Sequence, residues 1–202
     1  MKTNYSLEWL INEYENGISL KYIYFWGNTI KGIEISKTCF SQWYDSPFIV
    51  KDINYKTSEH WMMSQKALLF NDFTTFEKIV NCIKPGEAKD LGRTIKNFNE
   101  ELWQANRYAI VVSGNIHKFN QNKEIGRFLL ETKTRILVEA SPVDTVWGVG
   151  LTHDSNDIKD IYVWRGKNLL GFALMEARDF LSKHGFCEDF DDALFFPWQK
   201  GN

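Results

Sequence analysis

The residues best suited to chemistry gather in the segment 137–150, which combines two carboxylates, Glu139 and Asp144, with a tryptophan and two glycines. Pro142 excludes a regular helix through this segment and biases Ser141 toward an extended backbone. The glycines allow a ligand to approach the backbone closely, because they carry no side chain. The composition therefore predicts a loop that forms one wall of a functional site.

A second group of reactive residues lies on a helix that is expected to begin at Thr57 or Ser58. Glu59 and Lys66 are seven residues apart, so they share one helical face and stand about 10 Å apart along the axis. A carboxylate and an amine on one face usually indicate a solvated surface. The apolar residues around them favour a buried face instead, and partial burial would lower the pKa of Lys66 and make it a nucleophile.

Further along the chain, cationic, aromatic and amide side chains are spaced to hold a phosphate or a ring. Arg93 follows a short helix, where its guanidinium can either bind a phosphate or satisfy the carbonyls at the helix end. Trp103 and Arg107 are four residues apart, which puts them on one helical face. Asn168 is a typical N-cap, and the first-turn N–H groups of the helix after it can bind an anion.

Hydrophobic periodicity, caps and turn residues predict the elements that position these groups. Helices are expected over residues 1–20, 58–70, 72–83, 87–91, 99–119, 122–132 and 168–182. Aromatic and β-branched residues favour strands or extended backbone in four further segments, residues 22–26, 39–48, 53–56 and 161–164. The sum is an α+β fold, a predominantly helical single domain with a small β-sheet.

The chain divides into an N-terminal helical extension (residues 1–20), the domain itself (residues 21–183) and an acidic, aromatic C-terminal tail (residues 184–202). The extension is expected to lie outside the domain or against it. The tail either docks its aromatic residues on the domain or serves as a lid or a partner-binding segment.

The composition bounds the class of protein. With 24 basic and 26 acidic residues, the formal charge of −2 gives no strong field toward duplex DNA or an anionic membrane. Three cysteines without CxxC spacing argue against a disulfide framework and a structural zinc site, and His60 has no partner histidine nearby, which makes it a surface or supporting residue. The absence of a signal peptide and of any run of 18 apolar residues predicts a cytoplasmic protein without a membrane partner.

Aromatic residues make up 15% of the chain and include eight tryptophans. Core packing accounts for most such rings in a typical domain, and stacking walls for a base or a sugar are the alternative. Composition leaves both interpretations open for any single ring.

Seven blocks of the sequence resemble, in order and spacing, the NADAR family, which is also called YbiA-like. The blocks are Phe25–Gly27, Phe40–Phe48, Ser58–Ala67, Ala88–Arg93, Lys118–Phe119, Leu137–Gly148 and Asn168–Met175. The resemblance covers roughly residues 22–182 and leaves the N-terminal helix and the C-terminal tail outside. It implies a YbiA-like α+β fold.

The resemblance also implies a cytoplasmic N-glycosidase that cuts a ribose C1–N bond to an exocyclic amine. Some family members remove ADP-ribose from guanine in nucleic acid, in some cases as the antitoxin to a DNA ADP-ribosyltransferase. Others hydrolyse N-ribosyl intermediates of riboflavin biosynthesis and release ribose 5-phosphate. The expected partners are therefore ADP-ribosylated guanine in DNA or RNA, with a cognate toxin encoded nearby, or a ribosylamine phosphate.

Carried onto this sequence, the resemblance implies a role for each reactive residue. Lys66 is expected to be a nucleophile that forms a Schiff base with the opened sugar, and Glu59 and Asp144 are expected to be the acid/base pair. Glu139 is expected to orient this pair or to bind a sugar hydroxyl. The residues expected to contact the substrate are Trp26, Gly27, Arg93, Trp103, Glu139, Ser141, Trp147, Gly148 and Asn168.

The choice of nucleophile stays open, because Lys89 and Lys118 also lie in blocks of the resemblance. This chemistry requires neither a metal nor a cofactor, and none is predicted. A module that binds ADP-ribose or NAD without turnover is the remaining alternative. The joint presence of Glu59, Lys66 and Asp144 favours an enzyme, since a binding module needs neither an acid nor a nucleophile.

Overall fold

The computed structural model describes residues 4–27, 34–187 and 190 of the chain. Its helices are α1 (Leu7–Glu15), α2 (Ser58–Leu69), α3 (Phe73–Asn81), α4 (Pro85–Arg93), α5 (Glu100–Gln121), α6 (Lys123–Glu131) and α7 (Leu169–His184). Its strands are β1 (Tyr22–Phe25), β2 (Phe48–Val50), β3 (Ile53–Tyr55) and β4 (Ile136–Glu139). Short 3₁₀ helices lie at η1 (Lys37–Phe40), η2 (Asn156–Lys159) and η3 (Ile161–Val163). The expected α+β class with mostly helical structure is confirmed.

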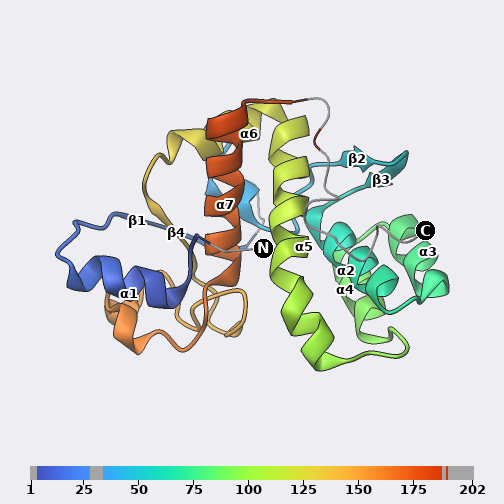
Figure 1. Ribbon diagram of the computed structural model, residues 1–202, viewed down its shortest axis with the longest axis horizontal. Coiled ribbons are helices and arrows are strands. Elements are labelled where there is room, and N and C mark those ends of the chain that lie inside the picture. The colour runs from blue at the N-terminus through green and yellow to red at the C-terminus, as the bar shows by residue number, and fades with distance from the viewer. Residues whose placement is uncertain (1–3, 28–33, 188–189, 191–202) are drawn as a thin grey trace.

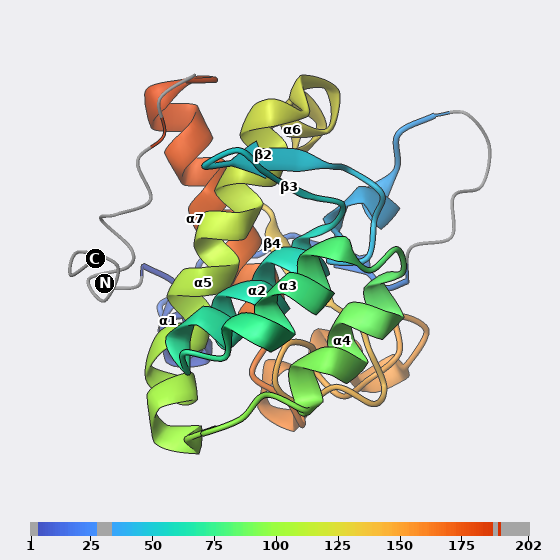
Figure 2. The same cartoon turned by 90° about the vertical axis from the view of Figure 1, so that its right-hand side faces the viewer.

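The two longest helices, α5 and α7, run side by side through the middle of the molecule (Figure 1). On one side, α7 packs against β4, which pairs in parallel with β1. On the other side, α2 packs on α5 and joins α3 and α4 to it (Figure 2). Strands β2 and β3 form a separate antiparallel pair, so the described residues hold two small sheets where one was expected.

Helix α2 carries two of the predicted catalytic residues, and nearly all of its side chains are buried. Its indole at Trp61 donates a hydrogen bond to the carbonyl of Ile110 on α5 at 2.9 Å. A Cβ atom at Gly114 of α5 would lie 2.4 Å from Trp61 Cδ1, so only glycine fits there. This close contact fixes α2 on α5 and determines where Glu59 and Lys66 stand.

Three expected segments differ from the structure. Residues 39–48 hold the end of the 3₁₀ helix η1 and a turn rather than a strand, since β2 begins only at Phe48. Residues 161–163 form a 3₁₀ helix rather than a strand, because the Asp160 side chain accepts a hydrogen bond from the backbone N–H of Tyr162 at 3.0 Å and caps a turn there. Residues 137–139, which were expected to begin a loop, belong to the buried strand β4. Its apolar run Ile136–Val138 is typical of a parallel strand buried on both faces, and the irregular loop begins after it.

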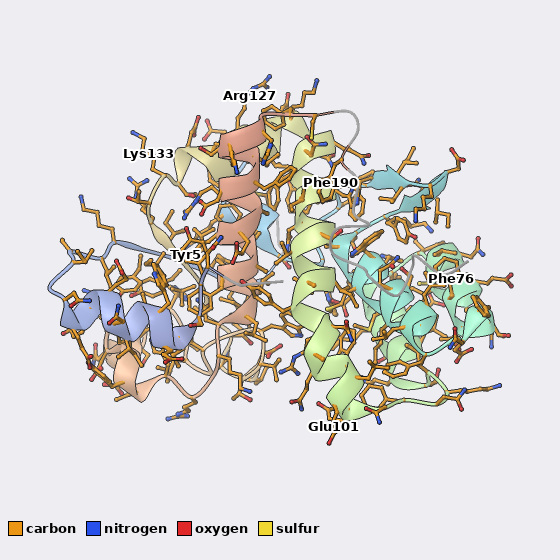
Figure 3. The ribbon with its side chains drawn as sticks, viewed as in Figure 1. Tyr5, Phe76, Glu101, Arg127, Lys133 and Phe190 are labelled. Carbon is orange, nitrogen blue, oxygen red and sulfur yellow. The ribbon has the colours of Figure 1, made fainter. Side chains whose placement is uncertain are left out.

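The N-terminal helix packs against the domain and is shorter than expected, since it spans only Leu7–Glu15. Leu10 is fully buried, and both nitrogens of Asn4 donate hydrogen bonds to the Glu176 carboxylate on α7, at 2.6 and 2.9 Å. Tyr5 lies beside α7 in the same region (Figure 3). These contacts tie the segment before β1 to the central helices.

In the C-terminal tail, Phe190 packs its ring against His117 of α5 and Phe180 of α7, with ring centres 4.7 and 4.9 Å apart (Figure 3). This residue therefore docks on the domain, as one of the two interpretations of the tail expects. The aromatic run Phe195–Trp198 lies outside the described residues.

Among the helices of the described chain, none is long and apolar enough to cross a membrane.

Candidate functional site

A cavity of about 690 Å³ lies between α2, α4, the start of α5 and the loop that follows β4. All the predicted site residues line it except Gly148 and Asn168. Those that do are Trp26, Gly27, Glu59, Lys66, Arg93, Trp103, Glu139, Ser141, Asp144 and Trp147. The fold thus brings the 137–150 segment and the Glu59–Lys66 helix face to one site.

Glu59 lies in the first turn of α2 and is only 4% exposed. Its backbone N–H donates to the carbonyl of Gln42 at 3.0 Å, and the Trp43 side chain hydrogen-bonds its carboxyl group. Its Oε1 has no hydrogen-bond partner within the described part of the chain. Burial raises the pKa of Glu59 to about 7, against the opposing charges of Lys89 and Arg93, so this carboxyl group can hold and donate a proton near neutral pH.

Glu139 ends β4, opposite Phe25 of β1, and its backbone N–H donates to the Asn168 side chain at 3.0 Å. Its Oε2 is buried and has no hydrogen-bond partner among the described residues. Burial raises the pKa of Glu139 to about 8, and the negative charge of Asp144 adds to the increase. Glu139 is therefore a second proton-holding carboxyl group on the cavity wall.

Asp144 is held by the backbone of its own loop. Its Oδ1 accepts hydrogen bonds from the N–H groups of Val146 and Trp147 at 2.8 and 2.7 Å, and its own N–H donates to Ser141 Oγ at 3.3 Å. These bonds give the loop its shape and fix the carboxylate beside Glu139. We call Glu59, Glu139 and Asp144 the carboxylate cluster.

Gly148 does not line the cavity, which corrects its expected contact with a ligand. A Cβ atom at this position would lie 2.8 Å from the carbonyl oxygen of Glu139 and 3.0 Å from that of Asp144. The glycine is required because the loop backbone folds back on itself there. It shapes the wall on which the carboxylate cluster stands.

Asn168 is also absent from the cavity wall and is fully buried. Its backbone is left-handed, with φ of 52°, and its side chain does not cap α7. The side chain instead bridges the N–H of Glu139 and the carbonyl of Leu137, which ties α7 to β4. Because the N–H groups of Leu169 and Leu170 donate to carbonyls of the loop, the helix start does not form the expected anion site.

Lys66 lies on the same wall, two turns along α2 from Glu59. Its Nζ donates to the carbonyl of Gly92 at 2.9 Å and lies 4.4 and 5.4 Å from the ring centres of Phe98 and Trp103. Burial lowers the pKa of Lys66 and the charge of Glu100 opposes this, in agreement with the prediction of a partly buried amine. We call Lys66, Phe98 and Trp103 the cation–aromatic region.

The structure separates the two alternative nucleophiles. Lys118 is fully buried, does not line the cavity, and donates hydrogen bonds to the carbonyls of Cys39 and Ser41 at 2.6 and 2.8 Å. Burial lowers the pKa of Lys118 to about 7. It holds the turn that carries Ser41 and cannot reach a substrate, whereas Lys89 lines the cavity with its ammonium 5.9 Å from the Trp43 ring centre.

In the structure the Arg93 guanidinium pairs with a carboxylate rather than with the carbonyls at the helix end, and its role in binding a phosphate stays a prediction. Its side chain is 67% exposed and pairs with Asp90 at 2.7 Å, one turn earlier on α4. An exposed pair of this kind is weak, so the guanidinium can exchange Asp90 for a phosphate. Trp103 and Arg107 line the same cavity from α5, as their spacing predicts.

His60 is fully buried, which excludes a place at the surface and leaves the other expected role, that of a supporting residue. Its Nδ1 shares a hydrogen bond with the Thr57 hydroxyl at 2.9 Å, so that side chain does not cap α2. Within the described residues, no group of three or more His, Cys, Asp or Glu side chains is arranged so that it could hold a metal ion.

The sequence analysis missed several residues of the wall, including Gln42, Trp43, Phe98 and Val143. Trp43 and Gln42 had a signal, because both lie in a block of the family resemblance, although their contacts with Glu59 are long-range. Phe98 lies in the connection between α4 and α5, and Val143 is 85% exposed in the loop after β4. Neither position has a periodic pattern that could assign it to a site.

The geometry agrees with the comparison to known families. A family model described as the NADAR domain matches residues 24–182. The chain belongs to the NADAR family. This match begins within β1 and ends within α7, so it contains every wall of the cavity.

Several curated proteins are similar to this NADAR chain. N-glycosidase R617 of Acanthamoeba polyphaga mimivirus is 40% identical over 168 residues, which cover 79% of this chain and 95% of the relative. N-glycosidase YbiA of Escherichia coli (strain K12) is 31% identical over 143 residues, or 71% of this chain and 79% of the relative. The NMR structure of E. coli YbiA matches with a TM-score of 0.66 and 27% identity, covering 85% of this chain and 90% of that one.

Proposed function

We propose that this chain is an N-glycosidase that removes ADP-ribose from the exocyclic amino group of guanine in nucleic acid. The enzyme class rests on the curated relatives, which are named N-glycosidases, so the expected reaction is hydrolysis of an N-glycosyl bond. The choice of substrate is supported by the size and chemistry of the cavity.

The observation that carries this proposal is the union of the carboxylate cluster and the cation–aromatic region in one cavity. Hydrolysis of a ribose C1–N bond needs a proton for the leaving amine and a negative charge near the positive charge that develops at C1. The cavity of about 690 Å³ lies in the upper half of the range of about 300–1,000 Å³ typical of ligand sites. It suits a ligand with more than one ring.

Within the carboxylate cluster, the structure supports a division of roles different from the one expected from sequence. Within the described part of the chain, Glu59 and Glu139 each have a buried oxygen without a hydrogen-bond partner, and each has a raised pKa, so they hold the protons that the leaving amine and the sugar require. Asp144 is committed to two backbone N–H groups and supplies the negative charge that stabilises C1. The acid role therefore moves from Asp144 to Glu139.

Lys66 supplies a covalent route through the opened sugar. Breaking the bond between C1 and the ring oxygen leaves an imine at C1, and the neutral Lys66 amine, once released from Gly92, adds to that carbon. The guanine amine then leaves with a proton from the carboxylate cluster, and C1 is joined to Lys66 as a Schiff base. Water adds to C1 and displaces Lys66, so one water molecule is consumed and guanine and ADP-ribose are released.

The remaining part of the cavity fits the adenosine and diphosphate of ADP-ribose. Arg93 and Arg107 provide guanidinium groups that match phosphate oxygens, and Trp103 and Phe98 provide rings for a base. A ribosylamine 5-phosphate has one phosphate and no second base, and it would leave the rings of Phe98 and Trp103 largely without a partner. This difference favours ADP-ribose over the riboflavin intermediates.

One experiment separates these functions. The purified chain is offered an oligonucleotide with ADP-ribosylated guanine and, in parallel, an N-ribosyl intermediate of riboflavin biosynthesis, and released ADP-ribose and ribose 5-phosphate are quantified. We expect ADP-ribose from the oligonucleotide at a rate at least about tenfold higher than ribose 5-phosphate from the small molecule. Faster release of ribose 5-phosphate would contradict the proposal that ADP-ribosylated guanine is the substrate. A thermal shift with ADP-ribose but no turnover of either compound would contradict the proposal that the chain is an enzyme.

The proposal also defines the reaction that must come before this one. An ADP-ribosyltransferase that modifies guanine has to supply the substrate, so we propose such an enzyme as the cognate partner. Co-expression should then protect cells from a guanine-specific ADP-ribosyltransferase. A Lys66→Ala variant is the matched control and should give no protection.

A further inference from the structure

Three apolar side chains remain exposed at the mouth of the cavity. Trp26, Trp43 and Val143 all line it and are 52%, 37% and 85% exposed. Trp26 follows β1 and Val143 lies in the loop after β4, so the parallel pairing of these strands places both on one wall. Trp43 belongs to the wall that holds Glu59. Exposed apolar groups gathered at a site mark a surface for contact with a ligand or partner.

The burial of the carboxylate cluster restricts how a nucleic acid can reach it. Glu59 is 4% exposed, so the C1–N bond must enter the cavity together with its guanine. In a duplex that guanine is stacked, and its exocyclic amine lies in the minor groove. Enzymes that act on a base accept a single strand or take the base out of the stack. The formal charge of −2 supplies no general attraction to a nucleic-acid backbone, so contacts with the bases themselves must carry much of the binding.

We propose that the indoles of Trp26 and Trp43, with Val143 as an apolar contact beside them, form a platform on which the nucleobases flanking the modified guanine stack, and that the preferred partner is single-stranded nucleic acid. This inference rests on the proposed function. When the guanine occupies the cavity, its neighbours lie at the mouth, where the indole of Trp26 is half-exposed. Stacking on an aromatic ring accepts every base, so the platform binds without regard to sequence. The ammonium of Lys89, near the Trp43 ring, adds a positive charge for the flanking phosphate.

The test compares substrates that share the same modified guanine. They are the ADP-ribosylated guanosine monophosphate, a seven-nucleotide single strand with this guanine at its centre, the same strand with abasic flanking positions, and the corresponding duplex. DNA and RNA versions of the strand are both included. We expect kcat/KM for the strand to exceed that of the monophosphate by about tenfold, the abasic strand to lose most of this gain, and the duplex to be the poorer substrate.

Variants connect the gain to the platform. Trp26→Ala is expected to reduce the ratio of strand to monophosphate kcat/KM toward one, Trp26→Phe to retain most of it, and Val143→Ser to lower it slightly. Phe73→Ala is the matched control, because Phe73 is 56% exposed on α3 and does not line the cavity. Trp43 is left intact, since its side chain also hydrogen-bonds Glu59.

Two outcomes would overturn the platform while leaving the proposed function in place. One is equal kcat/KM for the monophosphate and the strand, and the other is a gain that abasic flanking positions or Trp26→Ala do not reduce. If ADP-ribosylated guanine is not hydrolysed in any of these forms, the proposed function itself is wrong. The two failures are therefore distinguished by whether any of these substrates is hydrolysed at all.

Discussion

The carboxylate cluster and the cation–aromatic region lie in one cavity but are held in opposite ways. The backbone positions of Glu59, Glu139 and Asp144 are fixed by hydrogen bonds to Gln42, Asn168 and the loop itself. The Lys66 backbone is fixed in α2, but its long side chain is held at its far end, by one carbonyl and two aromatic rings. The first region is preorganised, whereas the second contains a group that can move toward a substrate.

This difference suggests a division of labour. A buried acid works best when its surroundings already disfavour its charged form before the substrate arrives, because reorganisation then costs little. A nucleophile that must first be released from a carbonyl and then approach C1 needs rotational freedom instead. The comparison therefore predicts that substitutions in the carboxylate cluster change pH dependence, whereas substitution of Lys66 removes the covalent step.

The largest effect is expected at Lys66. Lys66→Ala should lower kcat by about a thousandfold or more, because no other amine is placed to form the Schiff base. Losses of this size are typical when a covalent nucleophile is removed. Borohydride added during turnover should leave an ADP-ribosyl adduct that mass spectrometry locates at Lys66. Lys89→Ala is the control, since Lys89 also lines the cavity. An active Lys66→Ala variant without an adduct would contradict the Schiff-base route. An adduct at Lys89 would identify Lys89 as the nucleophile instead.

The next effect concerns the pH dependence of activity. Glu59 has a pKa of about 7 and Glu139 a pKa of about 8, so the protonated acids are lost as the pH rises through this range. We expect kcat/KM to fall on the alkaline side of neutrality. Glu59→Gln should lower it by roughly 100- to 1,000-fold at pH 6, the range typical of general acids. A Glu59→Gln enzyme with an unchanged pH–rate profile would exclude Glu59 from this role.

The same burial predicts a dependence of stability on pH. The folded-state pKa of Glu59 is raised from 4.5 to about 7, so the native state binds more protons than the unfolded state between these values. The contribution of Glu59 to the free energy of unfolding is therefore fully present below pH 4.5. It falls by on the order of 3 kcal/mol as the pH rises to about 7. Chemical denaturation of Glu59→Gln in parallel should show a smaller decline over this window. Equal slopes for the two proteins would contradict the raised pKa of this buried carboxyl group.

Much of this arrangement could be predicted from the sequence, and the exceptions have physical causes. The shared face of Glu59 and Lys66 was predictable because two helical turns separate the two residues. The burial of α2 was predictable from its apolar residues. The roles of Asn168 and Gly148 could not be predicted, since each depends on a contact made in the folded chain. Asn168 contacts β4, and Gly148 lies against the backbone of its own loop. An asparagine that hydrogen-bonds a distant strand and one that caps its own helix have the same local sequence pattern.

Asp144 offers a sharper test of how the carboxylate cluster works. In Asp144→Asn, the amide oxygen can still accept the hydrogen bonds from Val146 and Trp147, so the loop should keep its shape. The negative charge that raises the pKa of Glu139 and Glu59 is lost, which should shift the alkaline limb of kcat/KM to lower pH. We expect a loss of roughly ten- to a hundredfold at pH 7. If activity and its pH profile are both unchanged, Asp144 acts neither on C1 nor on its neighbours.

The smallest expected effect is at Arg93, which lies between the two regions. It follows Gly92, whose carbonyl holds Lys66, and its charge also acts on Glu59. Because its pair with Asp90 is exposed and weak, breaking it costs the fold little, and the guanidinium is available to a phosphate. Arg93→Ala should therefore raise KM a few-fold with little change in kcat, and Asp90→Ala, which frees the guanidinium, should lower KM or leave it unchanged. A fall in kcat without a change in KM for Arg93→Ala would instead place Arg93 with the groups that act on the reacting bond.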